Sequence, residues 1–191
     1  MSKRTLTLII ILVIVTGILV ALAVTPQKTP APVVVAPTPT PAAQTLLSFS
    51  PNPLLISSAS ASVDVAVDTG NNALTAVQLE LSYDPTVITS IKLTPASFFP
   101  NPVVLLENID AKNGKISYAL GIAPIDNPQK GQGAVVTVSF ATNLKAGQQT
   151  QISFLPKTLV SASQVAASVL KSASNLTILF QNPPPQATIS P

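Results

Sequence analysis

The sequence predicts an all-β fold, an antiparallel β-sandwich or jelly roll, and two observations support this prediction. From Leu46 onward, apolar and polar residues alternate with a period of two, which is the pattern of half-buried strands with one face in the core. Turn-forming clusters of Gly, Asn, Asp and Pro separate these runs. Short strands at such spacing are typical of sandwiches and jelly rolls.

The alternating runs define the predicted strands in chain order. They lie at residues 63–67, 77–83, 116–120, 134–140, 152–154 and 176–180. Asn113-Gly114, just before the run at 116–120, predicts a tight type I′ hairpin, because both residues tolerate positive φ. Residues 161–171 have apolar residues at near-helical spacing, so we expect one short helix there or an irregular edge.

An uncharged apolar segment occupies residues 5–24 and follows the basic pair Lys3 and Arg4. About 20 residues at ~1.5 Å rise each span the hydrocarbon core of a bilayer. We therefore interpret residues 1–25 as a cytoplasmic flank and a transmembrane signal-anchor helix, with the rest of the chain outside a cell membrane crossed once. The alternative is a signal peptide cleaved after Ala23, which would leave the domain secreted.

Proline-rich sequence flanks the predicted domain. Residues 26–44 alternate Pro with Thr, Ala and Val, which favours polyproline II and predicts a semi-rigid linker. The β-sandwich domain is expected over residues 45–182. Residues 183–191 begin with consecutive prolines and predict a disordered tail.

The composition excludes several classes of protein. The chain has no Cys and no His, so it lacks the thiolate, the commonest general base and the commonest transition-metal ligand. Its Lys residues are scattered singly, which is not the pattern of a nucleic-acid-binding protein. Its acidic residues form no recognisable pair for glycoside hydrolysis.

We therefore expect no enzyme activity, no catalytic residue and no cofactor. Carboxylates and amides do gather near one turn at residues 64–72 and at Asp126-Asn127. Because Asp and Asn are common turn formers and no calcium-loop spacing is present, we interpret them as turn residues and expect no metal.

Residues 79–88, LELSYDPTVI, end a strand in Tyr83-Asp84-Pro85 and continue into a β-branched run. This segment resembles the third strand and following turn of cohesin domains. Residues 131–140 and 150–154 are similar to later strands of that family, and residues 63–67 to an early core strand. The resemblance covers roughly residues 47–180 and implies a nine-stranded flattened jelly roll related to some carbohydrate-binding modules.

The resemblance also implies protein recognition. Cohesins bind dockerins, which are small calcium-dependent helical modules on enzymes of polysaccharide breakdown or on other surface proteins. The family uses a sheet face that includes the outward side of the strand before Tyr-Asp-Pro. In this chain that side presents Ala76, Gln78, Glu80 and Ser82, which we expect to contact the partner. Cellulosomal members often have Asp or Asn in place of Ala76 and Gln78, a departure that sets this chain apart from ordinary dockerin specificity.

The turn motif itself predicts structural roles. Tyr83 continues the inward parity of its strand, Asp84 is suited to accept hydrogen bonds from backbone amides in the turn, and Pro85 ends the strand ladder.

The sequence thus predicts a membrane-tethered, extracytoplasmic, non-catalytic module that docks a dockerin-bearing protein and is linked to polysaccharide binding or breakdown. Two alternatives stay open: a structural or adhesive cell-surface domain that self-associates, and a direct carbohydrate-binding module. Phe98 and Phe99 form an aromatic pair in a predicted loop, and we interpret them as a plug over the end of the sandwich.

Overall fold

The computed structural model describes residues 4, 7, 10, 12–17 and 43–181, and the chain divides into two compact units, Met1–Thr38 and Pro39–Pro191. In the first unit, residues 12–17 are helical. No helix among the described residues is both long enough and apolar enough to cross a membrane. The predicted span at 5–24 falls mostly outside the described residues, as do the linker up to residue 42 and the tail from residue 182, so these remain predictions.

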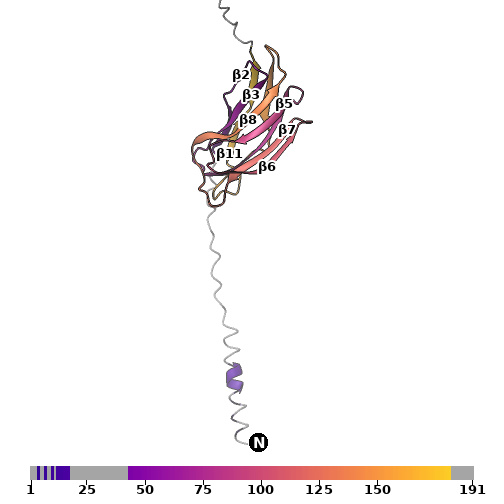
Figure 1. Cartoon of the computed structure of the whole chain (residues 1–191). Coiled ribbons are helices and arrows are strands. Elements are labelled where there is room, and N and C mark those ends of the chain that lie inside the picture. The colour runs from indigo at the N-terminus through magenta and orange to yellow at the C-terminus, as the bar shows by residue number, and fades with distance from the viewer. Residues whose placement is uncertain (1–3, 5–6, 8–9, 11, 18–42, 182–191) are drawn as a thin grey trace, which may run out of the picture. The chain divides into compact units, whose positions relative to one another are not determined.

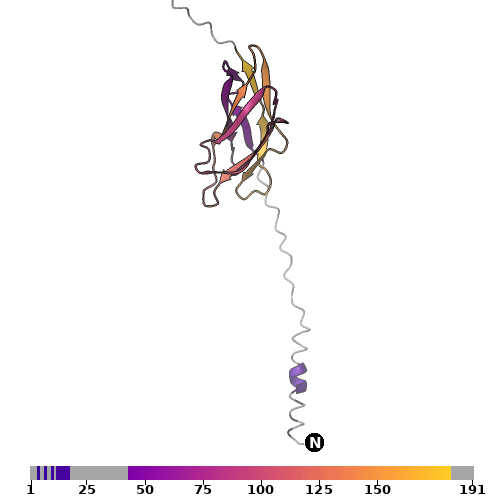
Figure 2. The ribbon, with the colours of Figure 1, turned by 45° about the vertical axis from the view of Figure 1, so that its right-hand side comes forward.

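The second unit is a β-sandwich of two sheets (Figure 1), seen from a second direction in Figure 2. Its strands are β1 (Thr45–Ser50), β2 (Leu54–Ile56), β3 (Ser60–Asp68), β4 (Leu74–Tyr83), β5 (Ile88–Pro95), β6 (Pro102–Asp110), β7 (Lys115–Ile122), β8 (Gln132–Thr142), β9 (Gln149–Phe154), β10 (Leu159–Ala162), β11 (Leu170–Ser174) and β12 (Leu176–Phe180). The predicted sandwich is confirmed, although the described residues form twelve strands rather than about nine.

The two sheets differ in size. The five-stranded sheet has the order β11-β1-β3-β8-β5, and the seven-stranded sheet has the order β2-β12-β9-β4-β7-β6, with β10 paired to β4. Most pairs are antiparallel as predicted, but β1 pairs with β11 and β2 pairs with β12 in parallel. Each parallel pair joins strands far apart in the sequence, so no tight hairpin has to connect them.

The core lies between the inner faces of the two sheets and follows the predicted alternation. On the seven-stranded sheet Leu79, Leu81 and Tyr118 are fully buried, and on the five-stranded sheet Val65 and Val138 are fully buried. A fully buried aliphatic side chain contributes about 1.5–3 kcal/mol of transfer free energy, so these alternating rows are the main stabilising feature of the domain.

The structure corrects the predicted hairpin at Asn113-Gly114 and decides between the two predictions for residues 161–171. Asn113-Gly114 does not form a two-residue type I′ turn: residues 111–114 make a four-residue loop, in which Gly114 has φ +63° and Asn113 does not have a positive φ. The reason is the Asp110 carboxylate, which accepts hydrogen bonds from the backbone N–H groups of Lys112 and Asn113 and so holds a wider turn. Residues 163–169 run through turns and bends and contain no helix.

Candidate functional site: the outer face of the seven-stranded sheet

The residues predicted to bind a partner lie together on central strand β4. Ala76, Gln78, Glu80 and Ser82 are all partly exposed, whereas the intervening Val77, Leu79 and Leu81 are buried. Because side chains alternate across a strand, the four residues form one row on the solvent side of the seven-stranded sheet.

Strand register extends this row into a face. β4 pairs with β7, and β7 pairs with β6, so the outward residues of three strands lie side by side. Leu159 of β10 lies opposite Gln78 on the other side of β4. We call this surface the outer face, and it comprises Ala76, Gln78, Glu80, Ser82, Val103, Leu106, Asn108, Asp110, Lys115, Ser117, Ala119, Gly121, Leu159 and Ser161.

One half of the outer face is polar and is organised around Glu80. The Ser117 hydroxyl donates to Glu80 Oε2 at 2.6 Å, and Gln78 Nε2 donates to Glu80 Oε1 at 3.0 Å. Lys115 and Lys157 line a pocket with Glu80. The carboxylate is thus held in one orientation by two neutral donors, with two cations beside it.

The backbone of Glu80 is also fixed. β9 and β10 lie end to end along β4, and the segment between them bulges out opposite Glu80. Leu155 N–H donates to the Glu80 carbonyl at 2.7 Å, and the buried Thr158 hydroxyl lies 3.1 Å from both the N–H and the carbonyl of Glu80. Glu80 is therefore positioned before any partner arrives, which lowers the ordering cost of binding.

The other half of the outer face is apolar. Val103 and Leu106 on β6 are each 43% exposed, and Leu159 on β10 is 45% exposed. Between them lie the small residues Ala76, Ala119 and Gly121. Small side chains with exposed aliphatic residues on either side form a surface on which another protein can pack closely.

The sequence did not predict strand β6, although it supplies most of this apolar surface. β6 is the edge strand of its sheet, and Val103, Val104, Leu105 and Leu106 are all exposed. A strand exposed on both faces has no reason to alternate, so the period-two pattern is missing. The run of consecutive aliphatic residues after Pro102 was the only indication of a strand here. Such a run is equally typical of a buried segment.

The turn motif after β4 lies outside this face. Tyr83 is buried, and its N–H donates to the Gly114 carbonyl at 2.9 Å. Asp84 Oδ1 accepts from the Thr86 N–H at 2.9 Å and from the Thr86 hydroxyl at 2.6 Å, and β4 ends at Tyr83, two residues before Pro85. These hydrogen bonds stabilise the turn that follows β4.

Three carboxylates in or beside turns have lowered pKa values. The Thr86 hydroxyl and N–H lower the pKa of Asp84, the Asn113 side chain and N–H lower the pKa of Asp110, and the Gly70 N–H and the Gln132 side chain lower the pKa of Asp68. In each case hydrogen bonds favour the ionised form.

Because of these three carboxylates, we expect the domain to be less stable in acid. Because their pKa values are lower in the folded state than in the unfolded chain, their contribution is complete above the ordinary carboxyl pKa and is lost as the pH falls through the lowered values. We expect a thermal midpoint that is nearly constant from about pH 6 to 8 and that falls below about pH 4. Calorimetry of Asp110→Asn should show lower stability at neutral pH and a smaller loss in acid, and a pH profile identical to wild type would contradict this.

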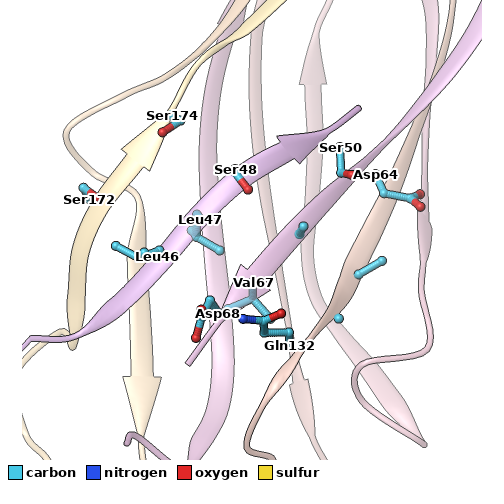
Figure 3. A pocket seen from close by; sticks show the side chains of 13 residues that line it. Leu46, Leu47, Ser48, Ser50, Asp64, Val67, Asp68, Gln132, Ser172 and Ser174 are labelled. Atoms are coloured by element: carbon cyan, nitrogen blue, oxygen red, sulfur yellow. Dashed lines mark hydrogen bonds between the residues drawn. The ribbon is translucent and has the colours of Figure 1, made fainter. Parts of the chain in front are cut away.

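A second concavity lies on the opposite sheet. Figure 3 shows Ser48 and Ser50 on β1, Asp64 on β3 and Ser174 on β11 around a groove over the five-stranded sheet. Its carboxylates are already paired within the domain, since Asp64 Oδ1 accepts from the Thr137 hydroxyl at 2.6 Å and Asp68 Oδ2 accepts from Gln132 Nε2 at 2.8 Å. The groove presents small polar groups without an aromatic side chain among its lining residues.

The aromatic residues of the domain do not form a platform for stacking on sugars. Phe98 and Phe99 are buried and contact each other with ring centroids 4.9 Å apart, and every other Phe and Tyr of the described residues is buried or half-buried. Within the same residues, no group of three or more acidic side chains gathers in a way that would hold a metal ion.

With this geometry established, comparison with known proteins identifies the family. The family described as Cohesin domain matches residues 59–180, more than half of the chain. The chain belongs to the cohesin family. No curated protein matches this cohesin at a significant level.

Solved structures of other cohesins have the same fold. The seventh ScaB type I cohesin from Pseudobacteroides cellulosolvens aligns with TM-score 0.61 at 12% identity, covering 77% of this chain and 98% of that one. The sixth cohesin from Acetivibrio cellulolyticus scaffoldin B, in complex with a mutant of the Cel5 dockerin, aligns with TM-score 0.59 at 16% identity, covering 72% of this chain and 99% of that one. A non-cellulosomal cohesin from the archaeon Archaeoglobus fulgidus aligns with TM-score 0.55 at 14% identity, covering 72% and 91%.

Proposed function

We propose that this cohesin is a non-catalytic docking module that binds a dockerin-bearing protein through the outer face of its seven-stranded sheet. The observation that carries the proposal is the composition of that face, where exposed Val103, Leu106 and Leu159 adjoin the fixed carboxylate of Glu80. An apolar centre beside oriented polar groups is the common anatomy of a protein interface. Several structurally similar cohesins were solved in complex with dockerins, which supports the choice of partner.

The tether is part of the proposal. The apolar segment at residues 5–24, preceded by Lys3 and Arg4, supports a single-pass anchor with the cohesin domain outside the cell membrane, spaced from the bilayer by the proline-rich linker. A dockerin-bearing enzyme captured there would be held at the cell surface, which is the proposed link to polysaccharide breakdown. Gel mobility of the mature protein with and without inhibition of signal peptidase separates this anchor from a signal cleaved after Ala23.

The direct test is binding of the full chain to each dockerin-bearing protein of the source organism, measured by biolayer interferometry. We expect saturable binding that requires calcium, because dockerins are calcium-dependent modules. Absence of binding by the whole set would contradict the proposal.

A second candidate is self-association, which the exposed edge of β6 favours. Its four consecutive aliphatic residues present an unpaired strand edge, a surface that can pair with another chain. Sedimentation velocity of the full chain without a partner distinguishes the two: a concentration-dependent dimer supports assembly, and a monomer that binds a dockerin supports docking.

Glu80→Lys tests the polar half of the proposed interface. The substitution removes the acceptor of Ser117 and Gln78 and places a third cation beside Lys115 and Lys157, so we expect about tenfold weaker partner binding with the fold intact. Asp64→Lys is the matched control, because it reverses one charge on the opposite sheet. Equal affinities for the two variants would mean that the polar half does not contact the partner.

A further inference from the structure

A pocket opens at the apolar end of the outer face, between β4 and the loop that joins β7 to β8. Ala76 and Gly121 of the outer face form part of its lining, together with Leu105 at the bulge of β6. The loop contributes Pro124 and Asp126. The pocket is therefore continuous with the proposed docking surface.

The loop wall of this pocket is fixed to the sheet. Leu74 N–H donates to the Gln129 carbonyl at 2.7 Å, and Gln129 N–H donates back to the Leu74 carbonyl at 2.9 Å. Within the loop, Asp126 N–H donates to the Ala123 carbonyl at 2.9 Å. These bonds fix the backbone on both sides of Asp126, which lines the pocket.

One carboxylate oxygen of Asp126 accepts no hydrogen bond within the described part of the chain. Its Oδ2 atom is buried, and no hydrogen-bond partner for it exists among the described residues. A buried carboxylate oxygen without a partner is costly, because its lost hydration is not replaced. Part of the desolvation cost of an ion pair at this site is therefore already present in the free protein.

We propose that this pocket takes a lysine or arginine side chain of the docked protein, with its cationic head on the Asp126 carboxylate. The inference rests on the proposed function, since the pocket adjoins the docking surface. Leu105 and Pro124 supply apolar contacts for the methylene stem, and the single carboxylate supplies the charge.

The surroundings favour a side chain over a metal ion. Calcium needs six to eight oxygen ligands, and among the described residues Asp126 belongs to no cluster of acidic side chains. A guanidinium or ammonium on an apolar stem needs only the carboxylate and the apolar walls. Its charge complements the one ionisable group that lines the pocket.

The first test uses arginine amide as the probe and the ¹⁵N-labelled full chain as the target. We expect saturable shifts of the amide resonances of Gly121, Ile122 and Asp126, and much smaller shifts with citrulline amide, which keeps the α-amino group of arginine amide but has an uncharged side chain of the same shape. In Asp126→Asn the apparent affinity should fall about fivefold, whereas Asp64→Asn on the opposite sheet should bind as wild type does. Equal shifts with citrulline amide, no shifts, or unchanged binding to Asp126→Asn would overturn the assignment.

A second measurement separates this inference from the proposed function. For a dockerin that binds the wild type, Asp126→Asn should lower affinity about tenfold, and removal of one basic residue of that dockerin should cause no further loss in the Asp126→Asn background. A dockerin that binds wild type and Asp126→Asn equally would refute the inference and leave the proposed function intact. If no dockerin binds while arginine amide still binds at Asp126, the proposed function fails and the cation site stands alone.

Discussion

Gly114→Ala is expected to destabilise the cohesin domain by about 3 kcal/mol, a loss of roughly 10 °C in thermal midpoint. Gly114 has φ +63°, a conformation that costs a residue with a Cβ atom about 1–2 kcal/mol. A Cβ atom there would also lie 2.1 Å from the Tyr83 carbonyl oxygen and 2.8 Å from Pro85 Cδ. The backbone of the Tyr83–Pro85 turn would have to move, and with it the hydrogen bond from Tyr83 N–H to the Gly114 carbonyl.

Gly147→Ala is the matched control for this effect. Gly147 also has a positive φ, +80°, but no atom lies within 4 Å of the position that a Cβ atom would take, so only the conformational cost of about 1 kcal/mol should appear. Urea denaturation of both variants measures the difference. Equal losses would show that the contact with the Tyr83–Pro85 turn does not contribute.

Leu106→Glu is expected to weaken binding of a dockerin-bearing partner roughly 30-fold or more. Leu106 lies on β6 opposite Ala119, within the apolar half of the outer face, and is 43% exposed, so the fold tolerates a charge there while a packed interface does not. Burying an unpaired carboxylate against apolar groups of a partner costs about 2 kcal/mol or more, which is the size of a hot-spot effect.

Leu55→Glu is the control for this prediction. Leu55 is 52% exposed and lies on β2, at the opposite edge of the same sheet from β6, away from the outer face defined above. It should leave affinity unchanged, with both variants showing wild-type thermal midpoints. A Leu106→Glu variant that binds like Leu55→Glu would move the interface off the apolar half of this face.

Much of the fold was readable from the sequence because burial alternates locally along each strand. The runs at 63–67, 77–83, 116–120 and 134–140 lie within β3, β4, β7 and β8. The expected residues are in the core except in β8, where an irregular register buries Val135 and leaves Ala134 partly exposed. The same parity placed Ala76, Gln78, Glu80 and Ser82 on the outward side of β4. Their role in binding a partner stays a prediction.

The rest of the candidate site was not readable because it depends on neighbours that are distant in the sequence. Val103 and Leu106 reach the outer face only through the register of β6 on β7, and Leu159 only through the pairing of β10 with β4. The fixation of Glu80 by Ser117 and Thr158 has the same origin.

By itself, the sequence determined the sandwich class, the inward and outward residues of its alternating strands, and the family resemblance. These properties follow from the local order of apolar, polar and turn-forming residues. Only the tertiary structure decided which outward residues share a surface, that β6 is an exposed edge, and that Asp126 has an oxygen without a donor. The physical reason is that alternation records which side of a strand faces the core, whereas strand order and register arise from pairing between segments that the chain brings together only when it folds.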